Sequence, residues 1–237
     1  MKKLSAFLVF GALAMTSALH AQTYAVYEYT ALLAGDTTIA NGGSSVEFAA
    51  LTPVRGEFRV DLSVPDSSTW VYPGEVGVYT DAVTAMSFVI GSYEFVGNGL
   101  GEFAVNNNRR LYSTGGAFED AVSASLTADA GSTFETTTLG GGIESMNFTV
   151  STGLVNPAPS ATTSISAPTT LDVADFTQSH TFTVTFGDTS TLVADLQSVS
   201  YSLSSEPSIV VPEASHSALA MGGLALVLGL LRRRRRQ

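Results

Sequence analysis

The chain contains no cysteine and little charge. Of its 237 residues, 14% are charged, against roughly 25% in average globular proteins. Without cysteine, the protein has no disulfides, no thiolate metal sites and no cysteine nucleophile. Hydrophobic residues make up 45% of the chain. This is enough apolar material for a packed core, and it is unlike the composition of a disordered protein.

Basic residues are scarce between residues 22 and 213, where all 21 acidic residues lie. The basic residues in this span are Arg55, Arg59, Arg109 and Arg110. Nucleic acids and anionic lipids are bound through Lys and Arg side chains that neutralise phosphate. The acidic span therefore predicts no nucleic-acid partner. It favours solubility outside the cell or attraction of cations.

Histidine is scarce as well, and the part of the chain between the two ends has His180 alone. A Ser-His-Asp triad would need this histidine, with Ser179 beside it and Asp175 or Asp188 near. Sequence neighbours on a strand point to opposite faces, and no Gly-x-Ser-x-Gly elbow surrounds any serine. The sequence therefore predicts no catalytic residues of this kind. A glycosidase pair of carboxylates on separate strands, about 5–9 Å apart, stays open as an alternative.

The first 21 residues have the three parts of a secretory signal peptide. Lys2 and Lys3 form a positive start, and residues 4–19 are mostly apolar. Ala21 before Gln22 offers a small residue at the cleavage position. We expect residues 1–21 to direct export through the Sec translocon and to be removed by signal peptidase.

The C-terminal end combines a Pro-Glu motif, an apolar stretch and a basic cluster. The motif is Val211, Pro212 and Glu213, and the apolar stretch is Ala218–Leu231. As a helix this stretch covers about 21 Å, short of the ~30 Å hydrocarbon core, so a transmembrane helix also needs the preceding residues. The basic cluster is Arg232, Arg233, Arg234, Arg235 and Arg236. It is expected to stay cytoplasmic and retain the chain in the membrane.

These three features, in this order, resemble the PEP-CTERM sorting signal of Gram-negative bacteria. The resemblance covers residues 211–237 and departs at Ala214, where the family usually has a second proline. It implies recognition by an exosortase, a transpeptidase-like membrane enzyme. It also implies cleavage near the Pro-Glu motif and release toward the cell surface or the extracellular matrix.

The residues between the two ends show strand patterns and almost no helix. Apolar residues alternate with polar ones over several short segments separated by turns rich in Gly, Asn and Pro. The segments are 25–33, 57–64, 86–90, 93–95, 122–126, 146–150, 181–186 and 199–203. Gly91-Ser92 predicts a hairpin between two of them. Residues 22–205 are therefore predicted to form one all-β domain, an antiparallel β-sandwich or jelly roll.

Two further segments bear on domain organisation. Residues 156–170 are rich in Pro, Ser, Thr and Ala and form either a linker or a long loop. We favour the loop, because residues 171–205 hold too few strands to stand alone. Residues 206–237 are predicted to form a short stalk followed by the sorting signal.

The sequence suggests two candidate ligand sites. Asp61, Asp66 and Glu75 surround a Pro/Gly turn, and oxygen ligands on loops suit extracellular Ca²⁺. No Asp-x-Asp-x-Asp loop is present, so solvated carboxylates are the alternative. Trp70 and Tyr72 would share a face if extended, and flat aromatic side chains stack on sugars as readily as they fill cores.

The sequence thus predicts an exported surface or matrix protein, sorted by an exosortase, whose β domain acts by structural or adhesive contact with exopolysaccharide. The alternatives are a secreted hydrolase of polysaccharide and a Ca²⁺-dependent binding module. No other cofactor is expected.

Overall fold

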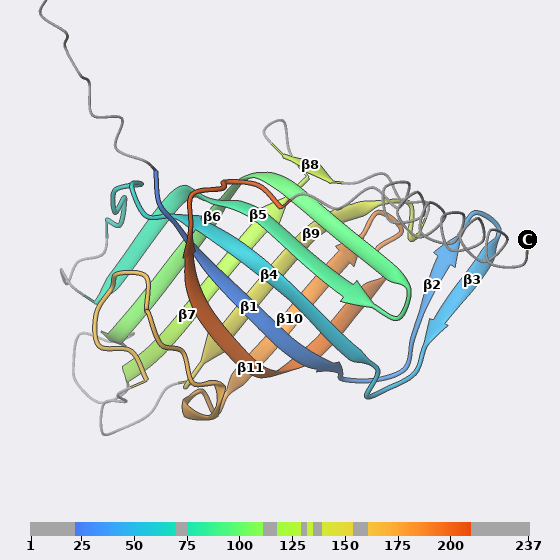
Figure 1. The fold of residues 1–237 in the computed structure, drawn as a ribbon. Helices are drawn as coiled ribbons and strands as arrows, with labels where there is room; N and C mark the ends of the chain where they lie inside the picture. The colour runs from blue at the N-terminus through green and yellow to red at the C-terminus, as the bar shows by residue number, and fades with distance from the viewer. Residues whose placement is uncertain are drawn as a thin grey trace, which may run out of the picture.

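The computed structural model describes residues 22–69, 75–110, 118–128, 132–134, 139–153 and 161–209. Within these ranges the chain forms eleven strands and one short 3₁₀ helix (Figure 1). The elements are β1 (Tyr24–Leu33), β2 (Thr37–Asn41), β3 (Ser44–Phe48), β4 (Pro53–Asp61), β5 (Val76–Ile90), β6 (Tyr93–Arg110), β7 (Phe118–Thr127), β8 (Thr133–Phe134), β9 (Ile143–Ser151), η1 (Val173–Asp175), β10 (Ser179–Phe186) and β11 (Thr191–Ser204).

Eight of the strands close into an antiparallel barrel. Their order around the barrel is β5, β4, β1, β11, β10, β9, β7 and β6, and pairing of β6 with β5 completes the circle. The short β8 adds to β6 from outside this circle. The first and last strands are neighbours, with Tyr24 opposite Ser204.

The all-β, antiparallel prediction is confirmed, but the sandwich or jelly roll is not. The described strands of the main sheet form one closed sheet instead of two stacked ones. Closure leaves the barrel strands without free outer edges over most of their length, which removes the hazard of unpaired backbone groups. The predicted hairpin is present, because Ile90 pairs with Tyr93 across Gly91, whose φ is 58°.

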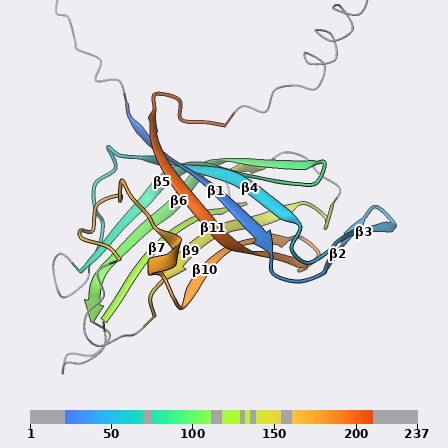
Figure 2. The same ribbon diagram turned by 60° about the horizontal axis from the view of Figure 1, so that its bottom comes forward.

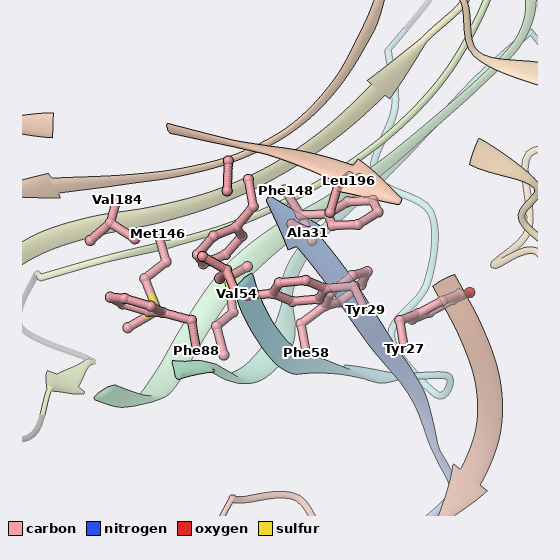
Figure 3. Packing of buried hydrophobic residues seen from close by; sticks show 14 of the residues in the cluster. Tyr27, Tyr29, Ala31, Val54, Phe58, Phe88, Met146, Phe148, Val184 and Leu196 are labelled. Atoms are coloured by element: carbon pink, nitrogen blue, oxygen red, sulfur yellow. The ribbon is translucent and has the colours of Figure 1, made fainter. Parts of the chain in front are cut away.

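The barrel interior is filled with aromatic side chains. Alternate residues of each strand point inward, and in eight-stranded barrels the enclosed space is just wide enough for side chains. Phe58 of β4 meets Phe148 of β9 on the opposite wall, with 4.8 Å between ring centroids. Phe88 of β5 and Phe182 of β10 meet in the same way at 5.6 Å. Figure 3 shows several of these side chains converging from different strands. The interior is a packed core.

Both ends of the barrel are covered. The β2–β3 hairpin covers one end, where Ile39 is fully buried and Phe48 packs edge-on against Tyr93. Residues 161–176, called the lid below, cover the opposite end (Figure 2). The lid buries Leu171 and Phe176 against the core. This segment includes the described part of the Pro/Ser/Thr-rich stretch of the sequence.

Residues 1–21 and 210–237 lie outside the described part of the chain, and so do the predicted signal peptide, the sorting motif and the arginine cluster. Among the described residues, no helix is both long and apolar enough to cross a membrane.

One glycine makes room for a buried cross-strand contact. The Tyr29 ring of β1 passes over Gly56 of β4, and its hydroxyl donates to the Ser87 carbonyl of β5 at 2.8 Å. A Cβ at Gly56 would overlap both the Ser87 carbonyl oxygen and the Tyr29 ring. Both neighbours are buried, so the overlap has no easy relief.

Gly56→Ala is therefore expected to lower the free energy of unfolding by about 1–3 kcal/mol, as overpacking of a core does. The measurement is urea unfolding of both proteins. Gly35→Ala is the matched control, because a Cβ at Gly35 meets nothing within 4 Å. Equal unfolding midpoints for the two variants would contradict the packing argument.

Candidate functional site

The barrel opens between β10 and β11 at the lid end. The two strands pair from Thr185 opposite Thr191 to Thr181 opposite Asp195, and no further pair follows. β11 continues along β1 as far as Ser204. In an antiparallel strand, alternate backbone groups face each neighbour. In the described part of the chain, the backbone of residues 197–203 therefore has no strand partner on the side away from β1.

A groove of about 400 Å³ lies between this edge of β11 and the lid. We call it the lid groove. Its lining residues are Tyr27, Thr169, Thr170, Leu171, Asp172, Val173, Gln197, Ser198, Val199, Ser200 and Tyr201. The lining combines aromatic and aliphatic side chains with hydroxyls, an amide and one carboxylate. None of these residues is Lys or Arg.

Two tyrosines form the aromatic part of the lid groove. Tyr201 is half-buried and meets Tyr27 edge-to-face, with 5.6 Å between ring centroids. The Tyr27 hydroxyl donates to the Pro168 carbonyl of the lid at 2.8 Å. Burial raises the pKa of Tyr27 above the usual range of a tyrosine, with a smaller effect from Tyr201. Tyr27 thus stays protonated as a donor to the lid, while Tyr201 presents its ring to the groove.

The polar part of the lid groove comes from both of its sides. Asp172 accepts a hydrogen bond from the Ala174 backbone N–H and so begins η1. On the β11 side, Ser198, Ser200 and Gln197 are exposed. The Ser198 hydroxyl also forms a hydrogen bond with the Thr30 hydroxyl of β1 at 2.7 Å. Hydroxyl, amide and carboxylate groups around an aromatic ring can bind a ligand rich in hydroxyls. A single acidic group without a cation disfavours an anionic ligand.

The lid is held in place by a buried carboxylate. Asp120 is fully buried on β7. One carboxylate oxygen accepts from the Thr162 backbone N–H at 2.8 Å, and the other accepts from the Asn108 backbone N–H at 2.7 Å. The Tyr79 hydroxyl adds a hydrogen bond to the Ile165 carbonyl at 3.0 Å. The position of the lid, and with it the width of the groove, depends on these contacts.

A second groove of about 540 Å³ lies on the outer wall of the barrel and is called the wall groove. Its charged lining residues are Glu28, Arg55, Glu57, Arg59 and Glu94. Glu28 and Glu57 are directly opposite each other on β1 and β4. The Glu57 carboxylate already accepts from the Arg59 guanidinium at 2.8 Å.

The predicted calcium ligands have separate partners. Asp61 accepts hydrogen bonds from Ser63 and from the Gln22 amide. Glu75 forms an ion pair with Arg110, with 2.9 Å between oxygen and nitrogen.

The third candidate, Asp66, accepts from two backbone N–H groups, those of Ser68 and Val78. In the described ranges, no group of three His, Asp or Glu side chains is placed to hold a metal ion. The calcium site stays a prediction.

The remaining sequence candidates have different outcomes. Trp70 and Tyr72, the predicted sugar-stacking pair, lie outside the described residues. His180 is half-buried at the start of β10, opposite Val150 of β9, and within the described chain its Nδ1 has no hydrogen-bond partner.

Sequence reasoning missed Asp120 and Tyr201 as residues of a site. Asp120 shares its strand face with Val122 and Ala124, which is a signal of burial. The sequence around Tyr201 gives no such signal. Polar and apolar residues alternate from residue 198 to 204, as they do in any half-exposed strand.

Replacing Asp120 with Ala leaves the buried Thr162 N–H and the half-buried Asn108 N–H without an acceptor. We expect a loss of about 2–4 kcal/mol in unfolding free energy and faster proteolysis of the lid. Asp188→Ala is the matched control, because Asp188 also accepts hydrogen bonds, among them those of the Ser190 backbone N–H and hydroxyl, but at an exposed turn. Lid cleavage at equal rates in both variants would argue against the role of Asp120.

The arrangement of barrel, lid and grooves does not by itself place the chain in a family. No family model, no curated protein and no solved structure matches this chain.

Proposed function

We propose that this protein is an exported, non-catalytic surface or matrix protein whose barrel binds neutral exopolysaccharide in the lid groove. The observation that carries the binding part is the lid groove itself. There, Tyr201 offers an aromatic ring beside exposed hydroxyl and amide groups and beside the unpaired edge of β11. Sugar rings stack on aromatic faces, and their hydroxyls both donate and accept hydrogen bonds.

The charge of the domain supports a neutral ligand. Asp172 is the charged residue of the lid-groove lining, and the surrounding span is strongly acidic. An acidic polysaccharide would meet repulsion without a compensating cation.

The proposal of export and sorting is based on the sequences of the two chain ends. Residues 1–21 have the order of a signal peptide. Residues 211–237 resemble the PEP-CTERM signal, with a short transmembrane helix and cytoplasmic arginines. We propose transient anchoring in the inner membrane of a Gram-negative bacterium. Cleavage by an exosortase near Pro212-Glu213 then releases the chain toward the cell surface.

The competing hydrolase hypothesis has one specific pair of residues to support it. Glu28 and Glu57 lie opposite each other on adjacent strands in the wall groove. A catalytic acid usually needs a buried, apolar setting, whereas Glu28 is exposed and Glu57 is paired with Arg59. We therefore favour binding without hydrolysis. If the wild type released reducing ends from the polysaccharide and the Glu28→Gln variant did not, the hydrolase hypothesis would be favoured.

The binding proposal is tested with the purified full chain and immobilised neutral polysaccharides, dextran among them, with polygalacturonate as the acidic comparison. We expect retention on a neutral polysaccharide and about a ten-fold weaker affinity for Tyr201→Ala. Tyr93→Ala is the control, because Tyr93 is also a half-buried aromatic residue but lies at the other end of the barrel. Unchanged affinity in Tyr201→Ala, or no retention of the wild type, would overturn the proposal.

The export and sorting proposal is tested by mass spectrometry of the protein released by its own cells. We expect a product that begins near Gln22 and ends near Glu213. A membrane-bound product that keeps Arg232–Arg236 would contradict sorting, and a complete chain in the cytosol would contradict export.

A further inference from the structure

The chain that leaves the last strand does not run free of the barrel. Residues 206–209, called the strap below, lie against the outside of β4, β5 and β6 (Figure 1). The Arg59 guanidinium of β4 donates to the carbonyls of Glu206 and Ser208, at 3.0 and 2.7 Å. Its other N–H groups donate to Glu57, at 3.0 and 2.8 Å. Glu57 thereby orients the guanidinium toward the strap.

Two more side chains complete the contact with the strap. The Thr84 hydroxyl of β5 donates to the Pro207 carbonyl at 2.6 Å. The Asn98 side-chain oxygen of β6 accepts from the Ile209 backbone N–H at 3.1 Å. Four consecutive residues of the strap are therefore held, each through a backbone atom. Such contacts fix the path of the chain whatever side chains it carries.

The strap ends close to the proposed cleavage site. Glu213 is the fourth residue after Ile209, and an extended chain of four residues reaches about 13 Å. An enzyme that cleaves an extended peptide uses several residues and hydrogen-bonds their backbone groups. Arg59, Thr84 and Asn98 already occupy these groups in the strap. An enzyme whose contacts extend from Pro212-Glu213 back to the strap therefore cannot bind while the strap is docked.

We propose that the docked strap limits protease access to the C-terminal segment, so that the barrel slows its own processing. The strap has to leave the outer wall of β4–β6 before an enzyme can enclose the chain ahead of Pro212-Glu213. The step is a local opening, and the fraction of open molecules sets the cleavage rate. The identity of the processing enzyme rests on the proposed function, but the docking of the strap does not.

The test uses the purified full chain in detergent with a low concentration of proteinase K. Cleavage within residues 206–213 is followed by mass spectrometry. Arg59→Gln removes two of the four contacts and is expected to accelerate cleavage about ten-fold or more. Thr84→Val removes one contact and is expected to give a smaller acceleration. Thermal melting of both variants should stay close to that of the wild type, because the core is unchanged.

Arg55→Gln is the matched control. Arg55 lies on the same strand as Arg59 and lines the same wall groove, and its replacement by Gln removes the same charge. In the described structure, however, Arg55 makes no hydrogen bond to the strap. Wild-type cleavage in Arg55→Gln together with faster cleavage in Arg59→Gln supports the proposal. Equal cleavage in Arg59→Gln and the wild type overturns it.

A second arm follows removal of the C-terminal segment in the producing cells for the same variants. Faster removal in Arg59→Gln than in Arg55→Gln supports a brake on processing, and equal rates contradict it. If the segment is never removed from any variant, the sorting proposal fails. The purified arm still decides whether the strap controls protease access.

Discussion

An eight-stranded barrel encloses a space that its own side chains have to fill, without voids and without overlap. In this protein aromatic rings from opposite walls meet in the middle, as Phe58 meets Phe148. Gly56 leaves the room that Tyr29 needs to reach across β4 to β5. The remaining architecture follows from this core, because its two ends also have to be shielded from water. The β2–β3 hairpin shields one end and the lid shields the other.

The segments that are not strands are held by side chains that bind backbone atoms. Asp120 holds the lid through the Thr162 N–H, and Arg59 holds the strap through two carbonyls. Charged groups make stronger hydrogen bonds than neutral ones, and in the lid they act together with the burial of Leu171 and Phe176. This arrangement explains how stretches rich in Pro, Ser and Thr can pack against the barrel. The lid and the strap therefore lie on the same barrel but are held by different residues.

The sequence predicts the strands well because alternation reports which face of a strand is buried. It does not predict the barrel, since alternation says nothing about which strands are partners, and sandwiches and barrels share the same pattern. The β2–β3 hairpin was missed, because Ile39 is its only fully buried residue in the described structure. The lid groove was missed for another reason. It exists because the pairing of β11 with β10 ends at Asp195, and the local alternation of β11 does not indicate where that pairing ends.

The pairing of β1 with β11 sets the order in which this fold can form. Tyr24 and Ser204 are opposite each other, although they lie near opposite ends of the polypeptide. During synthesis, the first strand to emerge from the ribosome has to wait for the last before the circle of hydrogen bonds can close. Contacts of such wide sequence separation slow folding, so the nascent chain stays open until its synthesis is almost complete. Before that point the strands from β4 to β10 can pair with one another, but they form an open sheet with two free edges.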